Sequence, residues 1–315
     1  MSKINWFPGH MHKARVQMTE ILPKVDLVIE ILDARIPYSS ENPMLAEIRG
    51  DKPVLKVLNK SDLADPDQTK VWKAYLERQQ GIKARAVTTA EPAKIKQLAF
   101  TCQEMFPNKQ GMGKFVTGMI CGIPNVGKSS LINILIGRKS AKIGNEPGVT
   151  KGQQKFKLHN GVVLLDTPGV LWPNVANEKS GYRLATIGSI KDTAMEYEDV
   201  AHFAAGILLE SYPDRVADRF KIDEMPETAL LLMDAIGQKR GCLSKRGIVD
   251  YERVSRILLT ELRSGKLGRI TFETPEMMEA EKAAVEKELA EKAEKKAVRD
   301  AERKANFKAR QQGRQ

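Results

Sequence analysis

Short apolar runs separated by polar, helix-like stretches dominate the first half of the chain. The run VDLVIEIL at 25–32 is rich in β-branched residues, which is typical of a strand buried on both faces. Comparable runs follow at 53–58, 84–87, 115–121, 155–158 and 162–165, and helices are predicted at 66–80 and 92–106. Asn160-Gly161, between the last two runs, predicts a tight antiparallel hairpin. Strands that alternate with helices predict an α/β fold with a mostly parallel sheet and helices on both faces.

The apolar spacing changes to that of amphipathic helices after about residue 175. Two groups of apolar residues have the spacing of one face of a helix. The first is Val200, Phe203, Ala204, Ile207 and Leu208, and the second is Val254, Ile257, Leu258 and Leu262. We therefore expect an α/β domain over 1–175, a small helical domain over 176–275 and a charged tail over 276–315. The tail is rich in Ala, Glu and Lys with few apolar residues, so we expect a solvated helix that is partly frayed or disordered.

The charge balance favours a polyanionic partner. The 315 residues carry 51 Lys and Arg against 40 Asp and Glu, a formal charge of +11, and 42% are hydrophobic, which excludes a fully disordered or fibrous chain. Bases exceed acids by five over 138–157 and by four over 239–256, and three more bases follow within 263–269. In the last forty residues the positive and negative charges nearly cancel. The positive field thus belongs to the folded part, although a merely solvated basic face gives the same pattern.

Membrane, secretory and disulfide-rich classes do not fit the sequence. No segment has the roughly 18 apolar residues that a spanning helix needs, and the first residues lack the pattern of a secretory signal. Cys102, Cys121 and Cys242 are widely spaced and form no C-x-x-C pair. We therefore expect a cytoplasmic protein without a disulfide framework or a zinc site.

The segment GIPNVGKS at 122–129 is a strong nucleotide-binding signal, because it follows a strand-like run and precedes an apolar helix. It matches G-x-x-x-x-G-K-[ST], in which backbone N–H groups wrap phosphates, Lys128 supplies charge to the β- and γ-phosphates, and Ser129 ligates Mg²⁺. The remaining nucleotide-binding candidates in this loop are Asn125, Val126, Gly127 and Ser130. A glycine-rich turn before a helix is the alternative, and the flanking elements disfavour it.

Two further segments are placed to complete the phosphate and magnesium site. DTPG at 166–169 ends the next strand pair, where Asp166 can hold the Mg²⁺ shell and the Gly169 amide can reach the γ-phosphate. A turn initiated by Asp would have the same sequence. Thr150 lies between the two motifs, where a switch threonine would meet Mg²⁺ only when the γ-phosphate is present.

A third motif points to guanine as the base. In Asn59-Lys60-Ser61-Asp62, which closes a strand-like run, the Asp62 carboxylate can accept hydrogen bonds from guanine N1 and N2, a donor pair that adenine lacks. Lys60 can lie along the ring, and Thr89-Ala90 can complete the pocket through the Ala90 amide. A helix cap or turn at the first segment and a plain loop at the second are the alternatives.

The order of these motifs is rotated. GTPases usually run phosphate loop, switch threonine, D-x-x-G, N-K-x-D and a final S-A loop, whereas here N-K-S-D and T-T-A come first. With WFPGHM at 6–11, DARIP at 33–37 and GKLGRI at 265–270, the chain resembles the bacterial YlqF/RbgA family of circularly permuted GTPases over about residues 3–275. The resemblance implies a permuted P-loop GTPase domain followed by a helical domain on ribosomal RNA. It also implies a role in late maturation of the large (50S) ribosomal subunit.

Catalysis needs a substitute for the glutamine that usually orients the attacking water, because Val170 follows Gly169 here. Similar GTPases imply that Asn125 helps to hold K⁺, and His10 is a candidate for orienting the water. A loop-shaping asparagine and a packing histidine are the alternatives. We expect Mg²⁺ and K⁺ as cofactors, slow turnover by the monomeric protein alone, and stimulation by the ribosomal subunit.

Three other functions fit part of the pattern. A permuted GTPase of the small subunit resembles a chain with an N-terminal OB barrel and a C-terminal zinc site, and the sequence here has room or ligands for neither. A metabolic P-loop kinase would not need N-K-x-D. An RNA-binding scaffold that nucleotide only stabilises, with negligible turnover, is the alternative from a different class.

Overall fold

The structure is a computed structural model that describes residues 16–109, 114–137, 154–158, 160–167, 177–190 and 195–312. Its internal contacts divide the chain into two units, 1–274 and 275–315. The boundary expected at 175–176 lies outside the described residues.

The first unit contains a six-stranded sheet in the order β3-β2-β1-β4-β6-β5. Its strands are β1 (Leu27–Asp33), β2 (Val54–Asn59), β3 (Ile82–Ala86), β4 (Val116–Gly122), β5 (Gln154–Lys157) and β6 (Val162–Asp166). All neighbours are parallel except β5 and β6, which form the antiparallel hairpin predicted around Asn160-Gly161. The predicted α/β class and mostly parallel sheet are confirmed.

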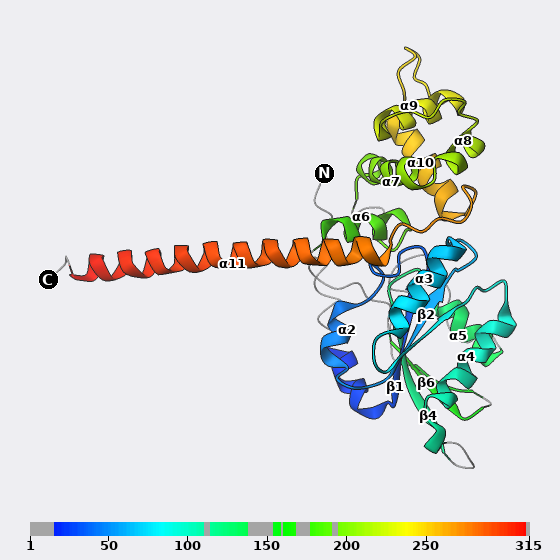
Figure 1. The fold of residues 1–315 in the computed structure, drawn as a ribbon, viewed down its shortest axis with the longest axis vertical. Helices are drawn as coiled ribbons and strands as arrows, with labels where there is room; N and C mark the ends of the chain where they lie inside the picture. The colour runs from blue at the N-terminus through cyan, green and yellow to red at the C-terminus, as the bar shows by residue number, and fades with distance from the viewer. Residues whose placement is uncertain are drawn as a thin grey trace. The chain divides into compact units, whose positions relative to one another are not determined.

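Helices cover both faces of this sheet (Figure 1). One face packs with α4 (Pro92–Glu104) and α5 (Lys128–Ile136). The other packs with the helical residues 16–21, with η1 (Leu22–Lys24) and with α2 (Pro43–Ile48). Because successive strand residues point to opposite faces and both faces are covered, strands such as β1 are buried at every position, which explains their mainly apolar sequences.

Local capping signals explain where the helix between β2 and β3 begins. This helix, α3 (Pro66–Glu77), has proline at its first position, and the Asp65 side chain accepts hydrogen bonds from the Asp67 and Gln68 backbone N–H groups. These contacts satisfy N–H groups that the first turn leaves unpaired, so they fix the start of the helix that the sequence predicted over 66–80.

The helical part of the first unit comprises α6 (Glu178–Thr186), α7 (Tyr197–Ser211), α8 (Pro213–Phe220), α9 (Ala229–Lys239) and α10 (Tyr251–Arg263). Helix α7 is central, since α6, α8, α9 and α10 all contact it (Figure 1). The apolar faces predicted for α7 and α10 are buried through residues such as Leu208 and Leu258. These side chains share one continuous core with the α4–α5 face of the sheet.

The segment after α10 runs back along the α/β part and holds it through backbone hydrogen bonds. The Ile270 N–H donates to the Leu63 carbonyl at 2.9 Å, and the Phe272 N–H donates to the Arg35 carbonyl at 2.8 Å. The buried Glu273 carboxylate accepts from the backbone N–H groups of Tyr38 at 2.7 Å and Ser39 at 3.0 Å. The motif GKLGRI therefore leads into a segment that is hydrogen-bonded to the α/β part of the first unit.

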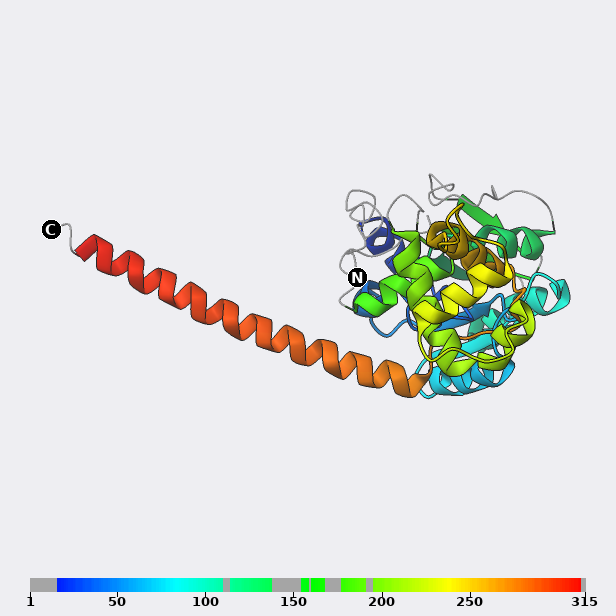
Figure 2. The same cartoon turned by 90° about the horizontal axis from the view of Figure 1, so that it is seen from above.

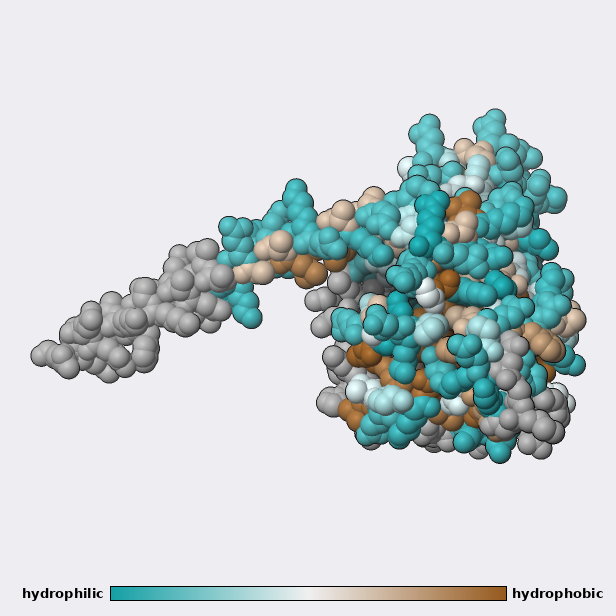
Figure 3. Space-filling model, turned by 60° about the horizontal axis from the view of Figure 1, so that its bottom comes forward, coloured by the Kyte–Doolittle hydropathy of each residue, from teal (hydrophilic) through white to brown (hydrophobic). Residues whose placement is uncertain are grey.

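The second unit is one helix, α11 (Pro275–Gln312), and the predicted tail is thus helical over almost all of its length (Figure 2). Between residues 279 and 296 its side chains are mostly exposed, and on the face seen in Figure 3 they are mainly hydrophilic. Lys292 forms an ion pair with Glu288 one turn earlier. Among the described helices, none combines the length and hydrophobicity that a membrane span requires.

Candidate nucleotide-binding site

The motifs that are scattered along the sequence converge on one edge of the sheet. Strands β1, β2, β4 and β6 are parallel, so their carboxyl ends lie at the same edge. In register, Asp33 pairs with Asn59, Ile31 with Gly122, and Ile120 with Asp166. Circular permutation changes the order along the chain but leaves these strand ends side by side, which is where open α/β sheets bind ligands.

The phosphate loop joins β4 to α5 and requires glycine at position 127. Gly127 has a φ of +93°, and a Cβ there would lie 2.4 Å from the Asn59 amide nitrogen. It is also the N-cap of α5 and offers no side chain to the N–H groups of the first turn. These N–H groups are available to an anion, as expected for a loop that binds phosphates.

Lys128 and Asp166 occupy the positions expected for phosphate and magnesium chemistry. The Lys128 ammonium donates to the Thr167 carbonyl at 2.6 Å and forms an ion pair with Asp166 Oδ1. Asp166 is fully buried, and burial raises the pKa of its carboxyl although the Lys128 charge lowers it. Its other oxygen, Oδ2, has no hydrogen-bond partner within the described part of the chain.

An unpartnered buried carboxylate oxygen fits a Mg²⁺ site, since Mg²⁺ takes one or two protein oxygens together with substrate phosphates. Ser129, in the first turn of α5, offers a hydroxyl oxygen of the same hard character. The described residues contain no group of three or more His, Cys, Asp or Glu that could hold a metal. Phosphate oxygens would therefore have to supply part of the coordination.

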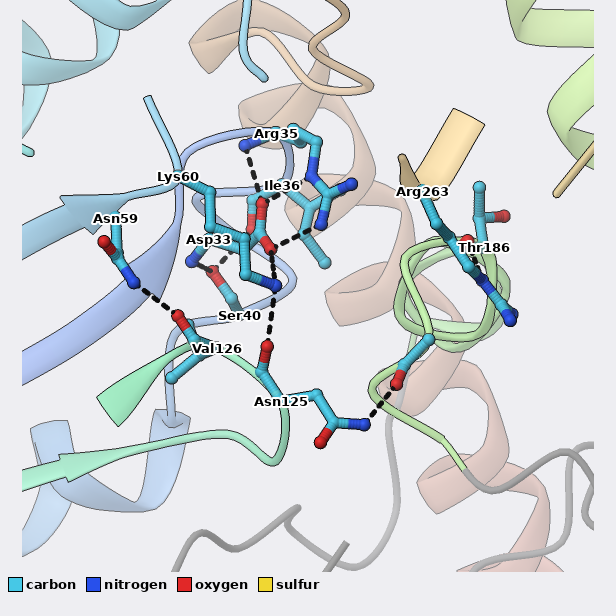
Figure 4. A network of polar contacts seen from close by, with 11 residues as sticks. Asp33, Arg35, Ile36, Ser40, Asn59, Lys60, Asn125, Val126, Thr186 and Arg263 are labelled. Carbon is cyan, nitrogen blue, oxygen red and sulfur yellow. Dashed lines mark hydrogen bonds and ion pairs between the residues drawn. The ribbon is translucent and has the colours of Figure 1, made fainter. Parts of the chain in front are cut away.

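The predicted guanine motif holds the phosphate loop directly (Figure 4). The Asn59 amide donates to the Val126 carbonyl at 2.7 Å, and the Lys60 ammonium donates to the Asn125 carbonyl at 2.6 Å. Lys60 has a left-handed φ of +57°, which is uncommon for a residue with a long side chain. The motif predicted for the base and the loop predicted for the phosphates are therefore in direct contact.

The remaining residues of the predicted base pocket lie in turns at the same sheet edge. Asp62 is exposed in the turn after β2, and Thr89 and Ala90 are exposed in the turn after β3. The Ala90 N–H donates to the Thr88 hydroxyl at 3.2 Å, so it would have to leave this partner to contact a base. Contacts of these residues with guanine stay predictions.

Asp33 and Arg35, which the sequence marked only as part of a family motif, belong to this site. The buried Asp33 carboxylate accepts from Arg35 Nε at 2.9 Å and from Arg35 Nη2 at 2.8 Å, and lies 3.1 Å from the Lys60 ammonium. Burial alone would raise the pKa of Asp33, but the charges of Arg35 and Lys60 hold it well below its usual value. The sequence feature that could have indicated this role is the position of Asp33 at the end of β1, the strand that pairs with the one ending in N-K-x-D.

The phosphate loop also contacts the helical part, through the side chain of Asn125. The Asn125 side-chain amide donates to the Gly188 carbonyl, just after α6, at 2.8 Å. Arg263, which the sequence grouped with bases for RNA, instead donates from α10 to the carbonyls of Thr186 and Ala185 at 3.0 and 2.7 Å (Figure 4). No local pattern indicated either contact.

Three predicted site residues, His10, Thr150 and Gly169, lie outside the described residues. Their roles in water orientation, Mg²⁺ binding and γ-phosphate binding therefore stay predictions.

Comparison with known proteins gives a consistent set of relatives. A family model described as "50S ribosome-binding GTPase" matches residues 117–241. Ribosome biogenesis GTPase A of Bacillus cereus is 46% identical over 291 residues, covering 90% of this chain and 98% of the relative. The protein of that name from Thermotoga maritima is 34% identical over 282 residues, covering 87% and 95%. Mitochondrial ribosome-associated GTPase 1 of Bos taurus is 34% identical over 292 residues, covering 85% and 88%.

Solved structures of YlqF from T. maritima are similar to this chain over nearly their whole length. The GDP-bound structure has a TM-score of 0.61 at 30% identity, covering 82% of this chain and 99% of YlqF. The GNP-bound crystal structure has a TM-score of 0.60 at 30% identity, covering 84% and 99%. The similarity thus includes both the α/β part and the helical part.

Proposed function

From the ribosome biogenesis GTPase A family, to which this chain belongs, we propose that the protein assists late maturation of the bacterial large (50S) ribosomal subunit in the cytoplasm. Family membership makes it a ribosome-associated, GTP-hydrolysing enzyme with a circularly permuted P-loop domain. The observation that carries the GTPase part of the proposal is the direct contact of Asn59 and Lys60 with the phosphate loop, which supports a single site for the guanine base and the phosphates. The matching family, described as a 50S ribosome-binding GTPase, supports the large subunit as partner.

In the proposed mechanism, the phosphates of GTP replace the Thr167 carbonyl and the Asp166 carboxylate as partners of Lys128. Asp166, released from this pair, would then join Ser129 and Thr150 as an oxygen ligand of Mg²⁺. The ion, when bound, supplies positive charge to the β- and γ-phosphate oxygens. The Gly169 amide would contact the γ-phosphate, and the N–H groups at the start of α5 would hold the β-phosphate.

The helical part carries the basic surface that we propose for ribosomal RNA. Several bases predicted for this role have partners, since Lys239 pairs with Asp223, Arg240 with Glu261, and Arg256 with Glu252. Five others are exposed without an ion pair to any described residue: Lys245, Arg246, Arg253, Lys266 and Arg269. The exposed apolar side chains of Leu243 and Ile248, which flank Lys245 and Arg246 in the sequence, offer apolar contact surface beside these charges.

Reversing the charge of Arg246, Arg253 and Lys266 to Glu should weaken binding to the large-subunit precursor and reduce the salt dependence of binding, because fewer counterions are released. Sedimentation with precursor particles in GTP, GDP and a non-hydrolysable analogue measures the effect. The matched control reverses three exposed lysines of α3 and α4, Lys70, Lys94 and Lys96. Unchanged sedimentation would exclude this surface, and association with the small-subunit precursor instead would favour the alternative partner.

We further propose that K⁺ assists hydrolysis at Asn125. Its amide nitrogen is held by the Gly188 carbonyl, so its oxygen is turned away from that partner and can serve as a cation ligand (Figure 4). GTP hydrolysis should be faster in K⁺ than in Na⁺ at equal ionic strength, because the smaller ion fits a K⁺-sized site less well. Equal rates of phosphate release in the two salts would contradict the potassium site.

His10 is proposed to orient the attacking water once the ribosomal subunit is bound. A neutral histidine can accept a hydrogen bond from water through one ring nitrogen. His10→Ala should lower subunit-stimulated phosphate release while sparing GTP and subunit binding, as expected when only a transition-state contact is lost. The control is His202→Ala, an exposed histidine on α7. A normal stimulated rate in His10→Ala would exclude this role.

A further inference from the structure

The turn that ends α6 is held by a defined hydrogen-bond pattern. Gly188 has a φ of +80°, and its N–H donates to the Ala185 carbonyl at 3.0 Å. The next N–H, that of Ser189, donates to the Leu184 carbonyl at 2.9 Å. This is the Schellman pattern, which ends a helix in a fixed direction. The Gly188 carbonyl therefore has a set orientation, and it accepts the hydrogen bond from the Asn125 side chain.

Arg263 clamps the same turn from α10. Its Nε donates to the Thr186 carbonyl at 3.0 Å and its Nη2 to the Ala185 carbonyl at 2.7 Å. A positive charge at the carboxyl end of a helix also interacts favourably with the helix dipole. The guanidinium lies close against Gly188, where a Cβ would come within 3.3 Å of Arg263 Nε. The position of Gly188 therefore depends on α10.

Asn125 connects this turn to the nucleotide site. It has a φ of +59°, a left-handed conformation that asparagine adopts more readily than most residues with a side chain, in the middle of the phosphate loop. Its carbonyl accepts from Lys60 on one side, and its side chain donates to Gly188 on the other. The two contacts hold the loop in one conformation, so that less ordering is required when phosphates bind.

We propose that Arg263 is a positioning residue of the nucleotide site, linking α10 to the phosphate loop through Gly188 and Asn125. Loss of the clamp frees the Gly188 turn, loosens Asn125 and weakens nucleotide binding. By linkage, any partner whose binding to the helical part moves Arg263 alters nucleotide affinity, and nucleotide alters the partner's affinity by the same factor. The link acts in the protein alone, so its test is independent of the proposed ribosomal partner.

A double-mutant cycle on nucleotide affinity tests the link. Arg263→Met should raise the Kd for a fluorescent GDP analogue about tenfold, since hydrogen bonds from a charged group are lost. Asn125→Gly keeps the positive φ but removes the amide, and in that background Arg263→Met should change Kd by less than about twofold. No change in the native background, or an equal change in both backgrounds, would overturn the proposal.

Controls separate positioning from general stability. Arg219 on α8 also makes a bidentate contact with α10, through Glu261 at 2.9 and 2.7 Å, whereas the contacts with the turn after α6 are made by Arg263. Arg219→Met should lower Tm and leave the GDP Kd unchanged. Arg263→Lys, which keeps the charge and one donor, should recover part of the affinity. If Arg263→Met does not fold, Gly188→Ala disturbs the same turn and is measured in the same cycle, with the same outcomes.

Discussion

Replacement of Asp62 by asparagine is expected to lower the affinity for GTP and GDP by a factor on the order of 10² to 10⁴, because a site built for guanine donors is left with mismatched polar groups. The asparagine oxygen can still accept from N1, but its amide nitrogen meets the exocyclic amino group of guanine donor to donor. Xanthine has a carbonyl at that position, so xanthine nucleotides should bind the variant better than guanine nucleotides do.

Competition between GTP, XTP and ATP for a fluorescent nucleotide measures this exchange of specificity. The matched control is Asp67→Asn, an exposed carboxylate in the first turn of α3 whose side chain is 82% exposed. It should leave all three affinities unchanged. Native-like preference for GTP in Asp62→Asn, or equal binding of ATP and GTP by the native protein, would contradict the assignment of Asp62.

Replacement of Asp33 by alanine should destabilise the fold by about 3–5 kcal/mol, the range observed when one partner of a buried ion pair is removed. Arg35 is buried and would lose both hydrogen bonds, and Lys60 would keep its charge without the nearby carboxylate. Lys60 also donates to the phosphate loop, so the affinity for GDP should fall together with stability.

The stability that the Asp33 carboxylate contributes depends on pH in a defined direction. Because the pKa of Asp33 is lower in the folded than in the unfolded protein, the carboxylate stabilises the fold above its unfolded pKa of about 4. This stabilisation is lost as pH falls towards the folded pKa. Burial raises the pKa of Glu30 to about 7 and also raises that of Glu273, and these groups act with the opposite sign. Because Glu30 and Glu273 are present in both proteins, their contributions to the pH dependence largely cancel in the difference between native and variant.

Urea unfolding of the native and Asp33→Ala proteins between pH 7 and pH 3 measures this difference. The gap in unfolding free energy should be constant near neutrality and narrow below about pH 4. The matched control, Asp26→Ala, removes a partly exposed carboxylate near the other end of β1 that pairs with Lys109 and accepts from the Thr117 N–H, and should cost about 1–2 kcal/mol. A gap below about 1 kcal/mol for Asp33→Ala at pH 7 would show that Arg35 and Lys60 find other partners.

The elements of the α/β part and the core of the nucleotide motifs were determined by the sequence itself. Apolar runs rich in β-branched residues marked the doubly buried strands, Asn160-Gly161 marked the hairpin, and the helix predicted over 66–80 is observed as α3. The phosphate loop and N-K-S-D were recognisable because their chemistry depends on residues at fixed short spacing. Parallel strands also bring their carboxyl ends together, so a common site followed from the strand pattern.

Only the tertiary structure decided which distant residues support that site. The contacts of Asp33 with Lys60, Asn125 with Gly188, and Arg263 with α6 join positions 27, 63 and 77 residues apart, and each partner alone has an ordinary sequence context. Arg263 lies on an amphipathic helix among surface bases, so charge and periodicity described it as solvent-facing. Local patterns report the face and the propensity of a residue. Which carbonyl its side chain meets depends on how helices pack, and that packing depends on all the side chains of the shared core together.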